Sequence, residues 1–260
     1  MIGAWFKRRF RSDGQGEREA GDAPVLPIET DIHSHLLPGL DDGVVDLESA
    51  LHLLSALERM GYRRLVTTPH VMADAYRNST LEIREGLESL REAAASHGLG
   101  LEIDAAAEYY LDEEFQRRLA SGDILTIGGE WVLFESSYYN EPFALEERIY
   151  EINARGYRPL LAHPERYRYV RDPGRFYGRL REMGVGFQVN INSLGGHYGQ
   201  DARIKAEWLA ERGWITFLGS DVHSIQQVRS LESVRDSGIL TRVVARNDIL
   251  NDTLPFSKEN

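Results

Sequence analysis

The sequence predicts an α/β fold, and within this class a distorted (β/α) barrel of seven units. Two observations predict it. From Glu29 onward, short apolar runs rich in β-forming residues alternate with segments of helical periodicity, and this alternation repeats seven times. Strands that are separated by helices pair in parallel through crossover connections. An open doubly wound sheet is the alternative arrangement of the same elements.

The expected elements follow one another in a regular order. The strands are expected at residues 30–33, 64–68, 101–107, 131–135, 159–162, 186–191 and 215–220. The helices are expected near residues 46–60, 80–97, 112–120, 141–155, 172–183, 201–212 and 225–238. Asp46 and Thr80 suit helix N-caps, and glycines stand where helices should stop, at positions 61, 98, 156, 184 and 213.

A chain of 260 residues is long enough for one such barrel with a full hydrophobic core. We expect three regions: a basic and polar appendage at residues 1–27, a catalytic domain at 28–250 and a tail at 251–260. The appendage places Trp5, Phe6 and Phe10 beside basic residues. Such segments can rest on anionic membranes, and a simple tail or an arm on another subunit are the alternatives.

Composition excludes several classes of function. The net charge of -11 argues against a general nucleic-acid binder, which needs a basic surface. The chain has no cysteine, so disulfides, thiolate metal sites and a cysteine nucleophile are excluded. No run approaches the roughly 18 apolar residues of a membrane span, and no secretory signal is visible. We therefore expect a cytoplasmic protein, with the inner face of the membrane as a further place of contact.

Residues able to bind metal stand at the carboxyl ends of the expected strands. They are His33, His35, Asp42, His70, Glu108, Glu135, His163, Asp221 and His223. Because catalytic residues of barrels gather at this end, we expect these side chains to meet. Nine ligands are too many for one ion, so two or three divalent ions are expected. Mixed nitrogen and oxygen ligands suit Mn, Fe, Zn or Co, and we favour Mn.

Such a cluster predicts phosphoester hydrolysis. Bound metals lower the pKa of water towards about 7 and neutralise charge during phosphoryl transfer, so we expect a metal-bound hydroxide to attack phosphorus. A modified lysine bridges the metals of many related barrels. The three lysines, Lys7, Lys205 and Lys258, end no expected strand, so Glu108 and Glu135 are the bridging candidates.

The chain resembles the polymerase and histidinol phosphatase (PHP) superfamily, and within it the bacterial capsular-polysaccharide tyrosine phosphatases. The resemblance runs from about Glu29 to Asp236. The motifs that carry it are Asp31-Ile32-His33-Ser34-His35, Asp41-Asp42-Gly43, Thr68-Pro69-His70, Glu108-Tyr109-Tyr110, Phe134-Glu135, Ala162-His163-Pro164-Glu165-Arg166-Tyr167 and Gly219-Ser220-Asp221-Val222-His223. The resemblance implies a distorted PHP-type barrel with a trinuclear metal site on the nine residues above. It also implies action on phosphotyrosine in the tail of a bacterial tyrosine kinase that controls polysaccharide synthesis and export.

The resemblance further implies phosphate binding by Arg166 and by Arg229. A guanidinium three residues past a ligand can form a two-pronged bond to phosphate, whereas an ion pair with Glu165 is the alternative for Arg166. Arg203 or Arg77 could take the place of Arg229. His197 follows the sixth expected strand and is a candidate proton donor. Several tyrosines just past strand ends could line a slot for a substrate ring: Tyr109, Tyr110, Tyr138, Tyr139, Tyr167 and Tyr198.

Two other functions fit the same cluster. One is a small-molecule phosphomonoesterase such as histidinol-phosphate phosphatase, which would need a closed pocket with an acidic partner for an amine. The other is a non-catalytic, metal-stabilised module that binds a kinase tail. The oligomeric state has no signature in the sequence.

Overall fold

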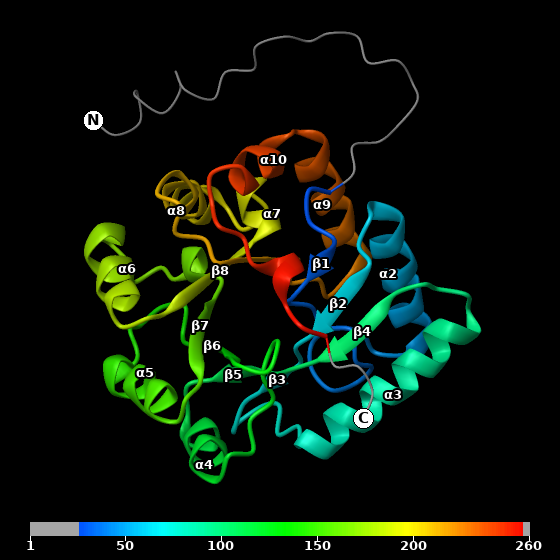
Figure 1. Cartoon of the computed structure of the whole chain (residues 1–260), viewed down its shortest axis with the longest axis horizontal. Coiled ribbons are helices and arrows are strands. Elements are labelled where there is room, and N and C mark those ends of the chain that lie inside the picture. The colour runs from blue at the N-terminus through cyan, green and yellow to red at the C-terminus, as the bar shows by residue number, and fades with distance from the viewer. Residues whose placement is uncertain (1–25, 257–260) are drawn as a thin grey trace, which may run out of the picture.

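The computed structural model describes residues 26–256 and shows strands surrounded by helices (Figure 1). The strands are β1 (Thr30–Asp31), β2 (Arg64–Thr67), β3 (His70–Val71), β4 (Glu102–Ala105), β5 (Glu108–Tyr110), β6 (Trp131–Glu135), β7 (Arg158–Ala162), β8 (Gly186–Asn190) and β9 (Phe217–Gly219). The α-helices are α2 (Leu47–Met60), α3 (Thr80–Ser96), α4 (Glu113–Ser121), α5 (Leu145–Ala154), α6 (Pro173–Glu182), α7 (Ile191–Leu194), α8 (Gln200–Glu211), α9 (Ile225–Asp236) and α10 (Ile239–Val244). Two 3₁₀ helices are η1 (Pro164–Arg166) and η2 (Asn251–Thr253).

Every pair of neighbouring named strands is parallel. The strands form two sheets, in the orders β1-β2-β4 and β3-β5-β6-β7-β8-β9. The predicted α/β class with a parallel, curled sheet is therefore confirmed. The count of seven units stays a prediction, because the described residues form nine strand segments.

Two of the expected strands are each followed by a further short strand. The expected strand 64–68 is β2, which ends before Pro69, and β3 begins at His70; the expected strand 101–107 is β4, and β5 begins at Glu108. Proline has no N–H to donate to a ladder, although the Pro69 carbonyl still accepts from Glu108 N at 3.1 Å. The pairs Thr67–Ala105 and His70–Glu108 keep one register across the break. The break therefore separates the two sheets without changing the register.

The first and last strands approach each other next to the predicted ligands. Ser34 and Val222 form an isolated parallel bridge, and Asp221 N donates to the His33 carbonyl at 2.8 Å. Nearer the amino ends, Asn251 Nδ2 donates to Thr30 O at 2.8 Å and to Leu218 O at 2.7 Å. These bonds connect β1 with β9 and bring their carboxyl ends together.

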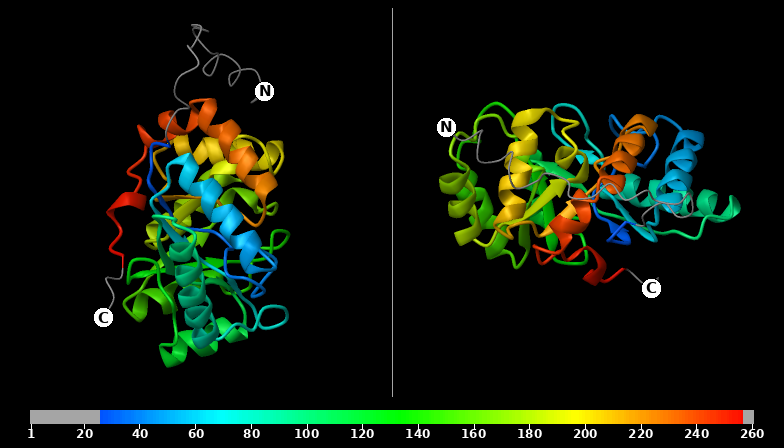
Figure 2. Two further views of the ribbon diagram at one scale, coloured as in Figure 1. Left: turned by 90° about the vertical axis from the view of Figure 1, so that its right-hand side faces the viewer. Right: turned by 90° about the horizontal axis from the view of Figure 1, so that it is seen from above.

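The core has two parts. One cluster consists of strand and loop residues alone, among them Trp131, Leu160 and Phe217, and fills the space between the strands. The larger cluster packs the helices onto the outside of the strands. In α3, for example, residues 83, 87, 90 and 94 are buried at helical spacing, and α3 packs beside α2 and against β4 (Figure 2).

The helix ends agree with the expected N-caps and terminating glycines, with one correction. Asp46 caps α2 through Ser49 N, and Gly61 ends the helix with a φ of 111°. The N-cap of α3 is Ser79 rather than Thr80, because Ser79 and Glu82 form a reciprocal capping box.

The expected appendage and tail lie partly outside the residues that the structure describes. Residues 1–25, most of the expected appendage, and residues 257–260 lie outside the described range. Residues 251–256 pack against the sheet, where Asn251 and Leu254 are buried. Within residues 26–256, no helix combines the length and apolar character that a membrane crossing requires.

Candidate metal centre

The structure brings the nine predicted metal ligands to one place. His33 and His35 follow β1, Asp42 precedes α2, His70 and Glu108 begin β3 and β5, Glu135 ends β6, His163 follows β7, and Asp221 and His223 follow β9. Each has a nitrogen or carboxylate oxygen within 3.5 Å of another member. The convergence follows from the parallel topology, since β1, β6, β7 and β9 end at the same edge, and His70 and Glu108 come just after the ends of β2 and β4.

Two imidazoles face each other at the centre of this group. The Nε2 atoms of His33 and His35 lie 3.3 Å apart. Their Nδ1 atoms lie 2.8 Å from Gln188 Oε1 and 2.6 Å from Asp41 Oδ2, and both of these oxygens can only accept. Each Nδ1 therefore carries a proton, which leaves the Nε2 lone pairs of the neutral rings directed towards the same point. Two converging lone pairs are the arrangement that a metal ion needs.

Glu108 is the carboxylate around which the histidines gather. Its Oε2 lies 3.2 Å from His33 Nε2 and 3.1 Å from His70 Nδ1, and its Oε1 lies 2.9 Å from His163 Nε2. Burial by itself raises the pKa of Glu108, but His33 and His70 outweigh it and hold the pKa well below the usual value. Burial likewise lowers the pKa of His33, whereas Glu108 and Asp221 raise it to about 9. The same negative field that favours the imidazolium also favours a divalent cation.

Seven of the nine residues fall into three overlapping groups with ligand-like spacing. The groups are His35, Asp42, His70 and His223; His33, His35 and Glu108; and His70, Glu108 and Glu135. His163 and Asp221 stand beside these groups through their contacts with Glu108 and His35. Glu108 Oε2 and His70 Nδ1 are buried and have no hydrogen bond within the described residues. These donors fit a cluster of divalent metal ions bound by nitrogen and oxygen.

Two of the predicted ligands have unusual backbone conformations. His163 has a φ of 31° and Asp221 a φ of 51°, whereas Ala144 is the single other non-glycine residue with positive φ in the described range. Such residues are strained and tend to occur at functional sites. Both turns are held by hydrogen bonds from the backbone N–H, to Gln188 Oε1 for His163 and to His33 O for Asp221.

Arg166 lies beside the cluster in a cavity of about 740 Å³. Its Nη1 donates to Asp221 Oδ2 at 2.8 Å, and its guanidinium lies 4.6 Å from the ring of Tyr138 and 4.3 Å from that of Tyr198. The alternative ion pair with Glu165 is not formed. Glu165 is buried and accepts from Asn190 N and Ser193 Oγ instead.

The structure does not bring Arg229 into this cavity. It is exposed on α9 and does not line the cavity, so its phosphate-binding role stays a prediction. The two possible replacements make local contacts, Arg77 with Ala73 O and Arg203 with Glu207.

The sequence analysis assigned no role to three residues that support the predicted ligands. Asp41 accepts from His35 and from His70 N, and Gln188 accepts from His33 Nδ1 and His163 N. Asn190 donates to Asp221 Oδ2 at 2.6 Å. The signal available was the alternation within β8, where the polar residues 188 and 190 are spaced by two in an otherwise apolar strand.

The tyrosines expected to line a slot divide into two groups. Tyr109 and Tyr167 are buried core residues, whereas Tyr110, Tyr138, Tyr139 and Tyr198 line the cavity, together with Tyr76. His197 also lines the cavity and contacts Ser230. His97 lies apart from this cavity at the carboxyl end of α3, and its Nδ1 contacts Ala93 O.

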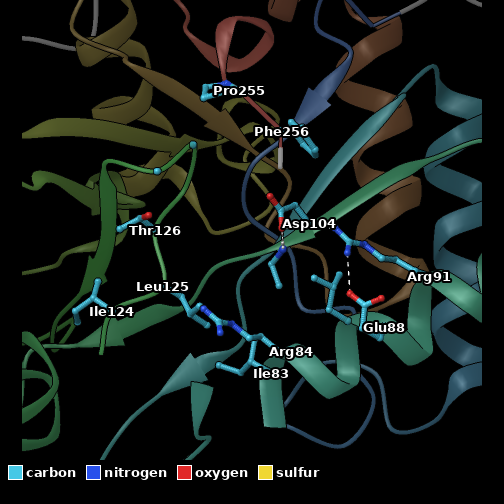
Figure 3. A pocket seen from close by; sticks show the side chains of 14 residues that line it. Ile83, Arg84, Glu88, Arg91, Asp104, Ile124, Leu125, Thr126, Pro255 and Phe256 are labelled. Carbon is cyan, nitrogen blue, oxygen red and sulfur yellow. Dashed lines mark hydrogen bonds and ion pairs between the residues drawn. The ribbon is translucent and has the colours of Figure 1, made fainter. Parts of the chain in front are cut away.

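A second large cavity, of about 690 Å³, contains none of the predicted ligands. It lies between α3, β4, the loop before β6 and residues Pro255 and Phe256 (Figure 3). In it, Arg91 forms an ion pair with Glu88 at 2.8 Å and donates to Ile103 O. The convergent metal-binding side chains thus favour the other cavity as the functional site.

The fold and the cluster together define a metal-binding α/β protein with its site at the strand ends. Residues 29–235 match the family described as "Capsular polysaccharide synthesis, CpsB/CapC". The chain therefore belongs to the CpsB/CapC family, as its motifs predicted.

Three relatives carry names of the same kind. The tyrosine-protein phosphatase YwqE of Bacillus subtilis is 29% identical over 197 residues, which cover 75% of this chain and 78% of YwqE. The putative tyrosine-protein phosphatase CapC of Staphylococcus aureus is 26% identical, covering 75% of this chain and 77% of CapC. The tyrosine-protein phosphatase CpsB of Streptococcus pneumoniae is 26% identical, covering 75% of this chain and 83% of CpsB.

Solved structures agree with this membership. A structure from work on YwqE of B. subtilis and CpsB of S. pneumoniae, described as unique metal-dependent tyrosine phosphatases, superposes with a TM-score of 0.73. It is 26% identical and covers 88% of this chain and all of that one. The lactonase Lmo2620 of Listeria monocytogenes, with 14% identity and a TM-score of 0.53, covers 91% of this chain and 97% of its own and shares the fold alone.

Proposed function

We propose that this protein is a metal-dependent tyrosine-protein phosphatase. The observation that carries the proposal is the convergence of five histidines and four carboxylates beside an arginine, in a cavity lined by tyrosines. The family membership and the names of YwqE and CpsB support the enzyme class predicted from the sequence.

We propose all nine convergent residues as metal ligands, for two or three divalent ions. Manganese is favoured, and iron, zinc or cobalt suit the same donors. When bound, such ions supply Lewis acidity, generate hydroxide from water near neutral pH and neutralise phosphate charge. In the same proposal the two sheets, joined through Ser34 and Val222, act as one distorted seven-unit barrel of the PHP type.

Arg166 is the proposed phosphate-binding residue of this chain. Its guanidinium is held between two tyrosine rings, so the side chain is oriented before a substrate arrives. Phosphate oxygens can accept from the guanidinium N–H groups that Asp221 does not engage. The rings of Tyr110 and Tyr139 are proposed to pack against the substrate ring, while Arg229 stays a weaker candidate that no contact supports.

The lining of the cavity favours phosphotyrosine over histidinol phosphate. The carboxylates that line it, Asp42, Glu135 and Asp221, are all proposed metal ligands. No further acid in the lining is left to bind an amine, as histidinol phosphate would require. The small-molecule phosphatase therefore remains the second candidate, and a non-catalytic tail-binding module the third.

The proposed partner is the phosphotyrosyl tail of a bacterial tyrosine kinase that controls polysaccharide synthesis and export. This partner rests on the family's description and on the resemblance of the motifs. A cytoplasmic location, with contact at the inner face of the membrane through residues 1–27, belongs to the same proposal. Nucleic acid is not a proposed partner.

Phosphate release tests the function directly. Hydrolysis of a kinase-tail phosphotyrosyl peptide and of histidinol phosphate is measured after chelation and again after Mn²⁺ is returned. We expect metal-dependent turnover of the peptide. A preference for histidinol phosphate would favour the small-molecule phosphatase. Inactivity on both substrates would favour the non-catalytic tail-binding module.

Two variants link the activity to the cluster. His163→Ala and Asp221→Ala should abolish turnover with the fold retained, as judged by circular dichroism. His52→Ala is the matched control, because His52 is exposed on α2. Full activity in either of the first two variants would overturn the assignment of the site.

A further inference from the structure

A smaller cavity of about 480 Å³ adjoins the active-site cavity. The two share Tyr138, Tyr139, Arg166 and Tyr198 as lining residues. The smaller one continues over the segment after η1 to the start of α8. A chain whose phosphotyrosine occupies the larger cavity thus has a continuous path into the smaller one.

The charge of this smaller cavity is opposite to that of the whole protein. Its lining holds Arg166, Arg168 and Arg171 against one acid, Asp201, although the chain carries a net charge of -11. Asp201 is already paired, because Lys205 Nζ donates to its Oδ2 at 2.7 Å. The local excess of positive charge is therefore available to a ligand.

Two of these arginines are free to bind an anion. Arg168 and Arg171 are exposed, and neither forms an ion pair with a carboxylate anywhere in residues 26–256. The carboxylate of Asp172, beside Arg171, accepts from Arg175 N at the start of α6. Arg179, by contrast, is neutralised by Glu141 and Glu146.

The segment that carries these arginines is anchored. Arg168 N donates to the Tyr138 carbonyl at 2.7 Å, and the Arg168 guanidinium lies 5.2 Å from the ring of Tyr139. The first turn of α8 also faces the cavity, and Gly199, its N-cap, supplies no side-chain cap. The unpaired N–H groups of this turn add to the positive potential.

From this arrangement we propose that Arg168 and Arg171 form a subsite that binds acidic side chains flanking the phosphotyrosine of a peptide substrate. The subsite rests on the proposed phosphatase function and adds a substrate class to it. An extended peptide spans about 3.3–3.6 Å per residue. Arg168 is two residues from the proposed phosphate-binding Arg166, and Arg171 is five residues from it. A peptide segment of the same length can span the same distance, so the acidic residues are expected within about five residues of the phosphotyrosine.

Matched phosphopeptides test the subsite. Each peptide carries one phosphotyrosine flanked on both sides by glutamate, by glutamine or by lysine, and free phosphotyrosine is the reference substrate. The kcat/KM of each peptide is divided by that of the same enzyme for free phosphotyrosine, so a general change in activity cancels. Exposed ion pairs contribute about 0.2–1 kcal/mol each, so the glutamate peptide should exceed the glutamine peptide on the order of fivefold.

Three variants connect this preference to the residues. Arg168→Gln, Arg171→Gln and the double variant should reduce the ratio of glutamate to glutamine peptide stepwise towards one. Arg63→Gln is the control, because Arg63 is exposed beside β2 at the opposite ends of the strands, and it should keep the wild-type ratio. An undiminished ratio in the double variant would refute the subsite.

The outcomes separate this inference from the function on which it rests. If the wild-type enzyme hydrolyses free phosphotyrosine but treats the three peptides alike, the subsite is refuted and the phosphatase stands. If it hydrolyses neither phosphotyrosine nor any peptide, both proposals fail together.

Discussion

Replacing Asp41 with asparagine should weaken metal binding although Asp41 is not itself a proposed ligand. Asp41 Oδ2 lies 2.6 Å from His35 Nδ1 and accepts from His70 N at 3.0 Å, and Oδ1 accepts from Gly43 N at 2.9 Å. An amide has one oxygen, so in Asp41→Asn the NH₂ group must face one of these N–H groups. The variant therefore loses a hydrogen bond and the charge that fixes the tautomer of His35.

Two free energies bear on the expected loss of metal affinity. Burial raises the pKa of Asp41, but the hydrogen bond and charge of His35, together with the N–H groups of Gly43 and His70, outweigh it and lower the pKa from 3.8 to about 2. At about 1.4 kcal/mol per pKa unit, the site thus stabilises this carboxylate by about 2.5 kcal/mol. Loss of a carboxylate that supports a metal-binding histidine costs about 10- to 100-fold in metal affinity, or about 1.4–2.7 kcal/mol. The second figure gives the expected loss of metal affinity, and the first is of the same order of magnitude.

The assay is competition for Mn²⁺ between the protein and a chelator of known affinity. Asp41→Asn should bind the ion at the His35 position about 10- to 100-fold more weakly, and added Mn²⁺ should restore phosphatase activity. Asp74→Asn is the control, because it removes the same charge from an exposed residue of the loop after β3. Metal affinity within twofold of wild type in Asp41→Asn, with the fold intact by circular dichroism, would refute the reasoning.

Three further predictions concern the substrate, the pH and the packing. Arg166→Lys should lower kcat/KM for phosphotyrosine by about 10- to 100-fold with unchanged metal content, because lysine cannot stack between two rings or bind two oxygens at once; equal kcat/KM would contradict this role. Burial raises the pKa of Asp31 from 3.8 to about 6, so the folded state binds the proton more tightly and stability falls as pH rises from about 4 to 6. In urea titrations of chelated protein, Asp31→Asn should remove this slope, worth up to about 3 kcal/mol, and an unchanged slope would disprove it. A Cβ on Gly43 would lie 2.3 Å from the His35 carbonyl oxygen, so Gly43→Ala should lower stability by roughly 1–3 kcal/mol in thermal melts, whereas Gly86→Ala, whose nearest atom is 3.7 Å away, should not.

The positions of the proposed ligands were predictable because they depend on topology alone. Once helices separate the strands, pairing is parallel, and a residue that ends a strand must lie at the common edge. His70 lies at this edge although it begins β3 and does not end β2. The strand before it breaks at Pro69, yet His70 still pairs with Glu108, because the register continues across the break.

The supporting residues were not predictable in the same way. Gln188 acts on His33 and His163 through contacts that span 155 and 25 residues of sequence, and a strand pattern shows only which face a residue occupies. Arg229 is the opposite case, because the sequence predicted it at the site and the structure does not bring it there. Arg229 lies one turn into α9, and the sequence does not determine to which side of the helix its side chain points. In the structure the residue is exposed to solvent.

The choice between Asp41 and Asp42 shows where three-dimensional packing decides a role. The two are identical neighbours, so no pattern of residue types distinguishes the proposed ligand, Asp42, from the residue that supports the proposed ligands, Asp41. Gly43 lies so close to the His35 carbonyl that a side chain has no room there, and its N–H donates to Asp41 Oδ1. This turn directs Asp41 inward, where its side chain is fully buried against His35, and leaves Asp42 with 56% of its side chain exposed between His70 and His223. The buried carboxylate thereby fixes a histidine, while the accessible one is free to meet a metal ion entering from solvent.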